Sequence, residues 1–336
     1  MRFLIAGFGS IGRRHLRNLL TLGERDVVLL RSGKSTLPTD ELAGLPVETT
    51  LEAALAHCPD VVIVATPTAL HMPLAIPAAE AGCTIFLEKP IAEDLRQVEE
   101  LRNALQRGGG QLLVGFQFRF HPGLQQVRSW LKEAAIGRPL LANAEWGEYL
   151  PDWHPWEDYR QSYAARADLG GGVARTLCHP LDYLRWLLGE VSQAQARAAQ
   201  VSDLEMEVED WAEFSLLFAN GVRGRVQVNY VQRPAVHRLE IVGTHGSIRW
   251  DASDGAAHCY RVGAQNPGCE WQTVSPPPGF ERNDLFLAQT RHLLAVAQGQ
   301  EPPRCTLEDG VRALELAALV NWQSGPKVGP RKDEQP

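Results

Sequence analysis

The segment RFLIAGFGSIGRRHLRNLL, residues 2–20, decides the fold expected for the first part of the chain. Residues 2–6 form a short apolar run typical of a buried strand, and the apolar residues that follow recur with the period of a helix. Gly7, Gly9 and Gly12 lie between the two. Their spacing suits a tight turn, a close approach of the backbone to a pyrophosphate and close packing of a helix on a strand. Because the motif follows a strand and opens a helix, it indicates a dinucleotide-binding unit; the alternative is a glycine-rich turn that binds nothing.

The first third of the chain alternates apolar strands with helices. Continuous apolar strands separated by helices are typical of a parallel sheet that helices cover on both faces. We therefore predict an α/β fold whose N-terminal domain, residues 1–118, is a doubly wound Rossmann domain. The predicted strands are 2–6, 27–30, 61–65, 84–88 and 111–116, and the predicted helices are 11–22, 51–57, 70–81 and about 94–107.

The start of the first helix and the end of the second strand are predicted to bind a dinucleotide. In NAD-binding folds an acidic residue about 20 positions after the glycines holds the ribose hydroxyls. This chain instead has Arg31, Ser32 and Lys34 after its second strand, and their positive charges suit the 2′-phosphate of NADP(H). A solvated basic turn is the alternative, and it leaves NAD possible. The residues predicted to meet the phosphates, at the free N–H groups of the helix start, are Gly7, Phe8, Gly9, Ser10, Ile11 and Gly12.

The composition excludes several classes of protein. A net charge of −7 and the lack of a basic run give no reason to expect nucleic acid or a membrane surface as a partner. No apolar stretch approaches the roughly 20 residues of a membrane helix, and a strand that begins at residue 2 leaves no room for a signal peptide. The six cysteines form no CxxC pair and the ten histidines no HExxH motif. We therefore expect a cytoplasmic protein without a disulfide framework or a metal site.

The chain contains, in this order, GFGSIG at 7–12, ATPTALH at 65–71, LEKP at 87–90, GGGVARTLCHPLD at 170–182, VEDWAEFSLLFANG at 208–221 and HRLEIVGTHGSIRW at 237–250. Together these motifs resemble those of the Gfo/Idh/MocA oxidoreductases. The resemblance implies an α+β domain at 119–326, whose large, mostly antiparallel sheet binds the substrate on one side and often dimerises through the other. It also implies a homodimer or homotetramer that uses NAD(P) on a hydroxyl or keto group of a sugar, a cyclitol or a related compound. Residues 327–336, rich in Pro, Lys, Asp and Glu, are expected to form a disordered tail.

Two charged residues end the apolar strand in the stretch TIFLEKP, residues 84–90. Neither charge belongs in a core, but the carboxyl ends of parallel strands open into the crevice where ligands bind. The resemblance implies that Lys89 contacts the substrate hydroxyl and takes part in proton transfer. It would act as a base with a lowered pKa or as a cation that polarises the oxygen; an exposed turn is the alternative. The resemblance also implies cofactor contacts from Thr66, Pro67, His71, Glu88 and Lys89.

His179 precedes a predicted helix that opens with Pro180. As the N-cap of that helix it would face a dipole that opposes a positive ring and favours a neutral imidazole able to accept a proton. The resemblance implies that His179 is the catalytic histidine, and Asp182 either orients it or only favours the helix start. Many family members carry an aspartate four residues before this histidine, but here that position is Arg175, followed by Thr176. A different proton relay, an anionic substrate bound by Arg175 and weakened catalysis all stay open.

The stretch AEWGEYLPDWHPWEDYRQSYAAR, residues 144–166, is dense in aromatic side chains. In a loop over a cleft, such rings would stack on sugar faces while neighbouring polar groups hold hydroxyls or a charge. A dimer contact or a loop packed on its own domain is the alternative. The predicted substrate contacts are Trp153, His154, Arg160 and Arg166 from this stretch, Arg175 and Thr176, and Arg119 near the domain junction.

The sequence therefore predicts an NAD(P)-dependent oxidoreductase, with NADP(H) favoured, that acts on a hydroxyl or keto carbon of a sugar-like substrate. The predicted catalytic residues are Lys89, His179 and Asp182. Two alternatives stay open. One is a nucleotide-binding sensor or regulatory protein with little catalysis on the same fold, and the other is a reductase of imine or enal-type groups.

Overall fold

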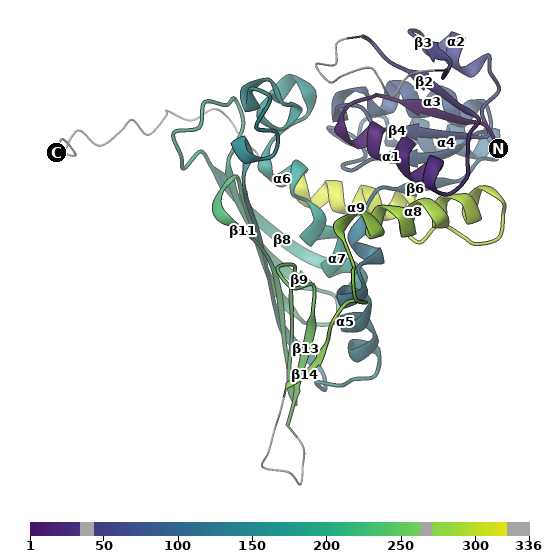
Figure 1. Ribbon diagram of the computed structural model, residues 1–336. Helices are drawn as coiled ribbons and strands as arrows, with labels where there is room; N and C mark the ends of the chain where they lie inside the picture. The colour runs from purple at the N-terminus through teal and green to yellow at the C-terminus, as the bar shows by residue number, and fades with distance from the viewer. Residues whose placement is uncertain (34–43, 263–270, 321–336) are drawn as a thin grey trace. The chain divides into compact units, whose positions relative to one another are not determined.

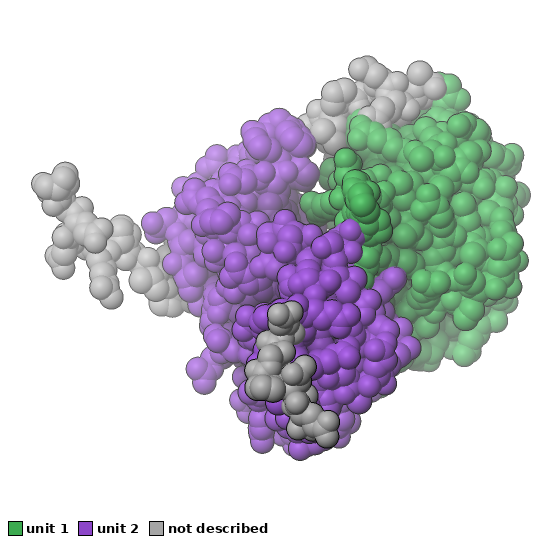
Figure 2. All heavy atoms as spheres, turned by 60° about the horizontal axis from the view of Figure 1, so that its bottom comes forward, with its two compact units in different colours: residues 1–122, 277–315 green, residues 123–276, 316–336 purple. Residues whose placement is uncertain are grey.

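The computed structural model describes residues 1–33, 44–262 and 271–320. The chain divides into two compact units, Met1–Pro122 with Pro277–Glu315, and Gly123–Pro276 with Leu316–Pro336 (Figure 2). The first unit therefore combines two separate stretches of sequence, so a single boundary along the sequence cannot divide the chain into these two units. Lys34 and the tail expected at 327–336 lie outside the described residues.

The first unit contains a six-stranded sheet in the order β3-β2-β1-β4-β5-β6 (Figure 1). Every neighbouring pair in this sheet is parallel. All residues of β1, β2, β4, β5 and β6 are buried, as expected of strands covered on both faces. The predicted Rossmann sheet is therefore confirmed. Its strands are β1 Phe3–Ala6, β2 Val27–Leu30, β3 Val47–Glu48, β4 Val61–Val64, β5 Thr84–Leu87 and β6 Leu112–Val114.

Glycine and capping residues mark the ends of several helices of this unit. Helix α1 buries Leu16 and Leu19 on one side, and α4 ends where Gly109 adopts a left-handed conformation with φ of 76°. Helix α8 begins with a capping box between Glu281 and Asp284. The helices are α1 Ser10–Thr21, α2 Leu51–Leu55, α3 His71–Glu80, α4 Val98–Gly108, α8 Arg282–Ala297 and α9 Leu307–Ala317, with 3-10 turns at Thr68–Leu70 and Gln117–Phe120.

The second unit contains an eight-stranded sheet in the order β14-β13-β12-β11-β7-β10-β9-β8. The β7–β10 pair is parallel and the other neighbours are antiparallel. This confirms the large, mostly antiparallel sheet that the resemblance implied. The strands are β7 Pro139–Tyr149, β8 Val191–Ala199, β9 Trp211–Phe218, β10 Arg223–Asn229, β11 Val231–Gly243, β12 Gly246–Asp251, β13 Ala257–Arg261 and β14 Trp271–Val274.

The two faces of this sheet differ. Along β7, Ala142 and Ala144 are buried whereas Asn143 between them is exposed, the alternation expected of a sheet with one covered face. Helix α7 packs against β7, and Figure 1 shows α5 and α7 along the same face. The helices of this unit are α5 Pro122–Lys132, α6 Val173–Thr176 and α7 His179–Leu188, and 3-10 turns lie at Leu150–Asp152, Tyr159–Gln161, Tyr163–Ala165 and Ala167–Leu169. No helix in the described part of the chain combines the length and apolarity that crossing a bilayer requires.

Candidate active site

The glycine turn between β1 and α1 has the geometry of a phosphate cradle. Gly7 has φ of 97°, and a Cβ on it would lie 2.5 Å from the Ala65 carbonyl oxygen. A Cβ on Gly12 would lie 2.1 Å from the Gly7 oxygen, whereas a Cβ on Gly9 would meet nothing within 4 Å. Gly7 and Gly12 therefore permit close packing, and Gly9 leaves the surface of the turn open.

The start of α1 complements this open surface. Gly9 is the N-cap residue, so no side-chain oxygen caps the helix, and the first turn contains no acidic residue. The first N–H groups of a helix have no partners within the helix and carry partial positive charge. They can therefore bind an anion. Ser10, Ile11 and Gly12 supply these groups, so the turn fits the pyrophosphate of a dinucleotide.

Substitutions of two of these glycines are expected to have opposite consequences. Gly9→Ala should leave the free energy of unfolding within about 0.5 kcal/mol of the wild type, since its Cβ meets nothing. It should nevertheless raise the Kd for the dinucleotide about tenfold or more, because the methyl group occupies the surface that the pyrophosphate approaches. Gly12→Ala should lower the free energy of unfolding by about 1–3 kcal/mol through overpacking. Urea unfolding and cofactor fluorescence titration measure the two effects, and a strongly destabilised Gly9→Ala variant would contradict this view of the turn.

Arg31 directly follows β2 and is half-buried. Its backbone N–H donates to the Glu48 carbonyl oxygen over 3.0 Å, and its Nε is buried without a hydrogen-bond partner among the described residues. Ser32, the next residue, is exposed. The guanidinium thus has donors available for an anionic group at this strand end.

His71 lies in the interior and joins the chain after β4 to the chain after β5. Its Nδ1 lies 2.9 Å from the Pro90 oxygen and its Nε2 lies 3.0 Å from the Thr66 oxygen. Burial lowers the pKa of His71, although these carbonyls favour the proton. His71 is 1% exposed, and its hydrogen bonds hold these two segments together; the cofactor contact that the resemblance implied stays a prediction. Thr66 and Pro67 are half-buried, and the Thr66 hydroxyl has no hydrogen-bond partner among the described residues.

Glu88 directly follows β5 and lies inside the unit. It is 7% exposed, and its Oε1 lies 2.8 Å from Nε2 of His15, which is 2% exposed on α1. Its other oxygen lies against Gly115, where a Cβ would be 2.8 Å away. The pair explains how a carboxylate can follow a core strand, and the predicted cofactor contact of Glu88 stays a prediction. Lys89 is half-buried and joined to Pro90 by a cis peptide bond.

His179 is the first residue of α7, and Cys178 is the N-cap. The predicted N-cap role of His179 is therefore wrong by one position, because Cys178 already takes near-helical angles with φ of −72° and ψ of 0° and still precedes the helix. His179 is 5% exposed and Asp182, in the first turn, is 1% exposed. Both side chains thus stand at a buried helix start, where the macrodipole disfavours a positive charge on the ring.

A cluster that sequence reasoning missed lies beside His179. The rings of Trp146 and His179 have centroids 5.2 Å apart, and Trp146 stacks at 3.8 Å on His237, its cross-strand partner on β11. The Trp146 Nε1–H donates to Glu148 Oε1 over 3.0 Å, and His237 Nε2 lies 2.8 Å from the same oxygen. Glu148 and His237 are 20% and 18% exposed. The alternation of Trp146 and Glu148 along β7 was the available signal, but it could not identify the partner strand.

The aromatic stretch at 144–166 is a loop only in part, because residues up to Tyr149 belong to β7. Trp153 lies edge-on to Tyr230 at 5.6 Å, with Nε1 buried and without a partner among the described residues. His154 packs beside Trp156 at 5.2 Å. Trp153 and His154 thus each pack against another ring, and their predicted contact with a ligand stays a prediction.

Three arginines that were predicted to contact substrate form ion pairs within the protein, and their substrate contacts stay predictions. Exposed Arg160 is 2.9 Å from Asp158 and 2.6 Å from Glu205, and half-buried Arg166 pairs with Asp168 at 2.5 Å. These ion pairs neutralise both side chains at the surface. Buried Arg119 belongs to the first unit, where it pairs with Asp309 at 3.0 Å and donates to the Arg304 oxygen over 2.7 Å. It ties the C-terminal stretch to the first unit.

The predicted residues of α6 point in different directions. Thr176 is 1% exposed and lies by Tyr230, whose pKa burial raises well above its usual value. Arg175 is half-buried. Thr176 is therefore buried within the unit, whereas Arg175 is partly exposed with its Nε buried.

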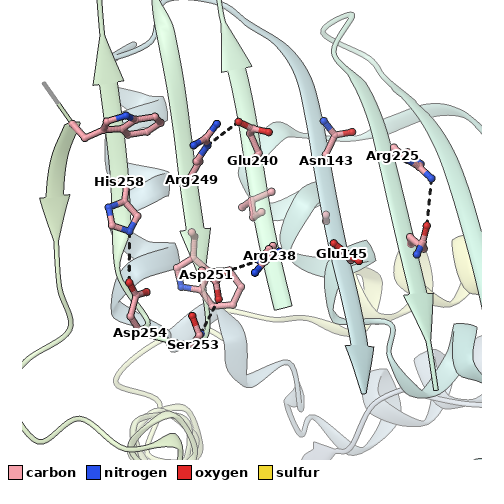
Figure 3. Close-up of a pocket in the computed structure, with 15 residues that line it drawn as sticks. Asn143, Glu145, Arg225, Arg238, Glu240, Arg249, Asp251, Ser253, Asp254 and His258 are labelled. Carbon is pink, nitrogen blue, oxygen red and sulfur yellow. Dashed lines mark hydrogen bonds and ion pairs between the residues drawn. The ribbon is translucent and has the colours of Figure 1, made fainter. Parts of the chain in front are cut away.

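A groove of about 760 Å³ lies on the open face of the large sheet (Figure 3). Figure 3 shows Arg238 directed at Asp251 and Arg249 at Glu240, and these pairs are 2.7 and 2.8 Å apart. Because strand side chains alternate between faces, Asn143 and Glu145 in this groove point away from Trp146. The groove is therefore separate from the His179 cluster. Within the described residues, no group of three His, Cys, Asp or Glu side chains could hold a metal ion.

Comparison with known families matches both halves of the chain. The family described as "Oxidoreductase family, NAD-binding Rossmann fold" matches residues 1–116, and the "GFO/IDH/MocA C-terminal domain" matches residues 124–249.

Individual relatives extend over nearly the whole chain. Myo-inositol dehydrogenase Hyg17 of Streptomyces leeuwenhoekii is 30% identical over 329 residues, which cover 94% of this chain and 95% of that protein. D-apiose dehydrogenase of Paraburkholderia graminis is 27% identical over 349 residues, covering 96% of this chain and 88% of that protein. A levoglucosan dehydrogenase solved with NADH and L-sorbose shares the fold with a TM-score of 0.84 at 20% identity, over 95% of both chains. The chain therefore belongs to the Gfo/Idh/MocA family of oxidoreductases, whose Rossmann domain binds NAD.

Proposed function

We propose that the protein is a dehydrogenase that transfers a hydride between NAD(P) and a hydroxyl or keto carbon of a sugar, a cyclitol or a derivative. The observation that carries the proposal is the open turn at Gly9 with the uncapped start of α1 behind it, which fits the pyrophosphate of a dinucleotide. Membership of the family and relatives named myo-inositol and D-apiose dehydrogenase support the substrate class. The nicotinamide, when bound, supplies the acceptor or donor of the hydride.

The residues of the chain divide the remaining work. His179 takes the proton of the reacting hydroxyl and returns it in the reverse direction, because the dipole at a helix start disfavours a positive ring and so favours an imidazole that can accept a proton. Lys89 supplies a cation that can polarise a substrate oxygen. Asp182 holds the orientation of the α7 start. Glu88 and His15 anchor the strand end from which Lys89 extends.

NADP(H) is the cofactor that we propose, on account of Arg31. Purified, cofactor-free protein titrated with NADPH and NADH in parallel should bind NADPH more tightly. Arg31→Gln should weaken NADPH binding about 10–100-fold, which corresponds to the free energy of hydrogen bonds to a charged group. It should leave NADH binding unchanged. Turnover of a panel of polyols and keto-sugars with the preferred cofactor then tests the reaction.

Each outcome of this titration decides a separate point. Equal binding of the two nucleotides would show that Arg31 does not select NADP(H), and NAD would become the working cofactor. Binding of a nucleotide without turnover of any polyol, keto-sugar, sugar acid or sugar phosphate would contradict the dehydrogenase and favour a nucleotide-binding regulatory protein. The homodimer or homotetramer implied by the resemblance stays a prediction.

A further inference from the structure

Arg175 is the one residue between Gly170 and Arg185 that is not buried. It lies on the short helix α6, and Leu177 and Cys178 separate α6 from α7, which begins at His179. Arg175 is therefore the residue of this segment that is partly open to solvent. The segment contains both the candidate catalytic histidine and this cation.

Within residues 1–33, 44–262 and 271–320, the charge of Arg175 has no ion-pair partner. Among the described residues, no carboxylate forms an ion pair with it, and its Nε–H is buried without an acceptor. Arg160, Arg166 and Arg185 of the same unit each pair with a carboxylate. A buried N–H without an acceptor is unfavourable, and a guanidinium offers five donors in a fixed fork that matches a carboxylate or a phosphate.

Glu209 is the carboxylate that acts on Arg175 electrostatically, but its oxygens have other neighbours. Its Oε1 accepts the Ala174 N–H over 3.1 Å, and a Cβ on Gly172 would lie 2.6 Å from the same oxygen. Glu209 is 2% exposed, and burial raises its pKa. It is therefore packed against the backbone of α6 and leaves the donors of Arg175 available.

We propose that Arg175 binds a carboxylate or phosphate group of the substrate, so that the protein acts on sugar acids or sugar phosphates. This rests on the proposed dehydrogenase function and narrows its substrate class. The guanidinium holds the anionic group through paired N–H···O bonds, and His179 lies four residues further on at the start of the next helix. The anionic group is thereby held near the carbon that reacts.

Binding to the protein saturated with NADPH, or with NADH if that binds more tightly, tests the proposal. The probes are glucose, glucuronate and glucose 6-phosphate, and the same three forms of galactose, followed by nucleotide fluorescence and by turnover. We expect at least one charged form to bind about tenfold or more tightly than its neutral parent. Arg175→Gln should abolish that preference, Arg175→Lys should retain part of it, and added salt should weaken it. The carboxylate and phosphate arms show which anion fits.

Arg197→Gln is the matched control, because it removes one exposed arginine of the same unit from β8. It should keep the wild-type preference. If neutral sugars are bound and turned over while the charged forms bind no more tightly, or if Arg175→Gln keeps the preference, the anion site is refuted and the dehydrogenase stands. If neither nucleotide binds, or no sugar of either charge is bound or turned over, the proposed function fails and the anion site fails with it.

Discussion

Replacing His179 with asparagine is expected to lower kcat by about 10²–10⁴-fold, the usual contribution of a general acid–base group. The ring starts α7 and is 5% exposed, so it is held in place by the buried helix start and by Trp146. Asparagine preserves polarity at the helix start but cannot accept the proton at neutral pH. The measurement is steady-state turnover with the substrate found in the panel, at saturating nucleotide.

Nucleotide binding provides the control for this variant. The Kd for NADPH should be unchanged, since the turn at Gly9 belongs to the first unit and His179 to the second. Trp146→Phe should lower kcat less than His179→Asn does. It changes the ring that packs on His179 but keeps the imidazole that accepts the proton. A His179→Asn enzyme with wild-type kcat would remove this residue from the proposed mechanism.

Replacing His15 with leucine is expected to lower the free energy of unfolding by about 3 kcal/mol, because it leaves the Glu88 carboxylate buried without its partner. The two side chains are 3% and 10% exposed and 2.8 Å apart, so solvent cannot compensate for the lost contact. Urea or thermal unfolding measures the loss. Turnover should fall as well, since Lys89 follows Glu88 directly at the end of β5.

A double-mutant cycle separates this pair from general damage to the core. Glu88→Met combined with His15→Leu replaces both partners with apolar side chains and should recover much of the stability lost in His15→Leu. Strictly additive losses in the double variant would show that the two side chains do not stabilise each other.

The Rossmann sheet was predictable because its signals are local. Each strand of the first unit is a short apolar run, and the turn at Gly7, Gly9 and Gly12 adjoins the first of them, so no distant contact was needed to recognise it. The same holds for the start of α7, where a proline marks the helix to within one residue.

The parts that escaped prediction depend on contacts between distant segments. The sequence shows a histidine on α1 and a glutamate after an apolar strand, but their pairing requires the packing of α1 on the sheet. Trp146 and His237 meet only because β7 and β11 are neighbours in a particular register. In the sequence, Arg119 is only a cation near a domain junction. Its ion-pair partner Asp309 comes from a distant part of the chain and could not be identified without the fold.

The return of residues 277–315 to the first unit has a consequence for the order in which the protein is made. The N–H of Val114 on β6 donates to the Cys305 oxygen over 3.0 Å, and Arg14 on α1 reaches Asn283 over 3.3 Å. A ribosome that has just completed the six-stranded sheet must still add the whole second sheet before these partners exist. The first unit therefore lacks part of its chain during most of translation. It can complete its fold only after residues 277–315 have been synthesised.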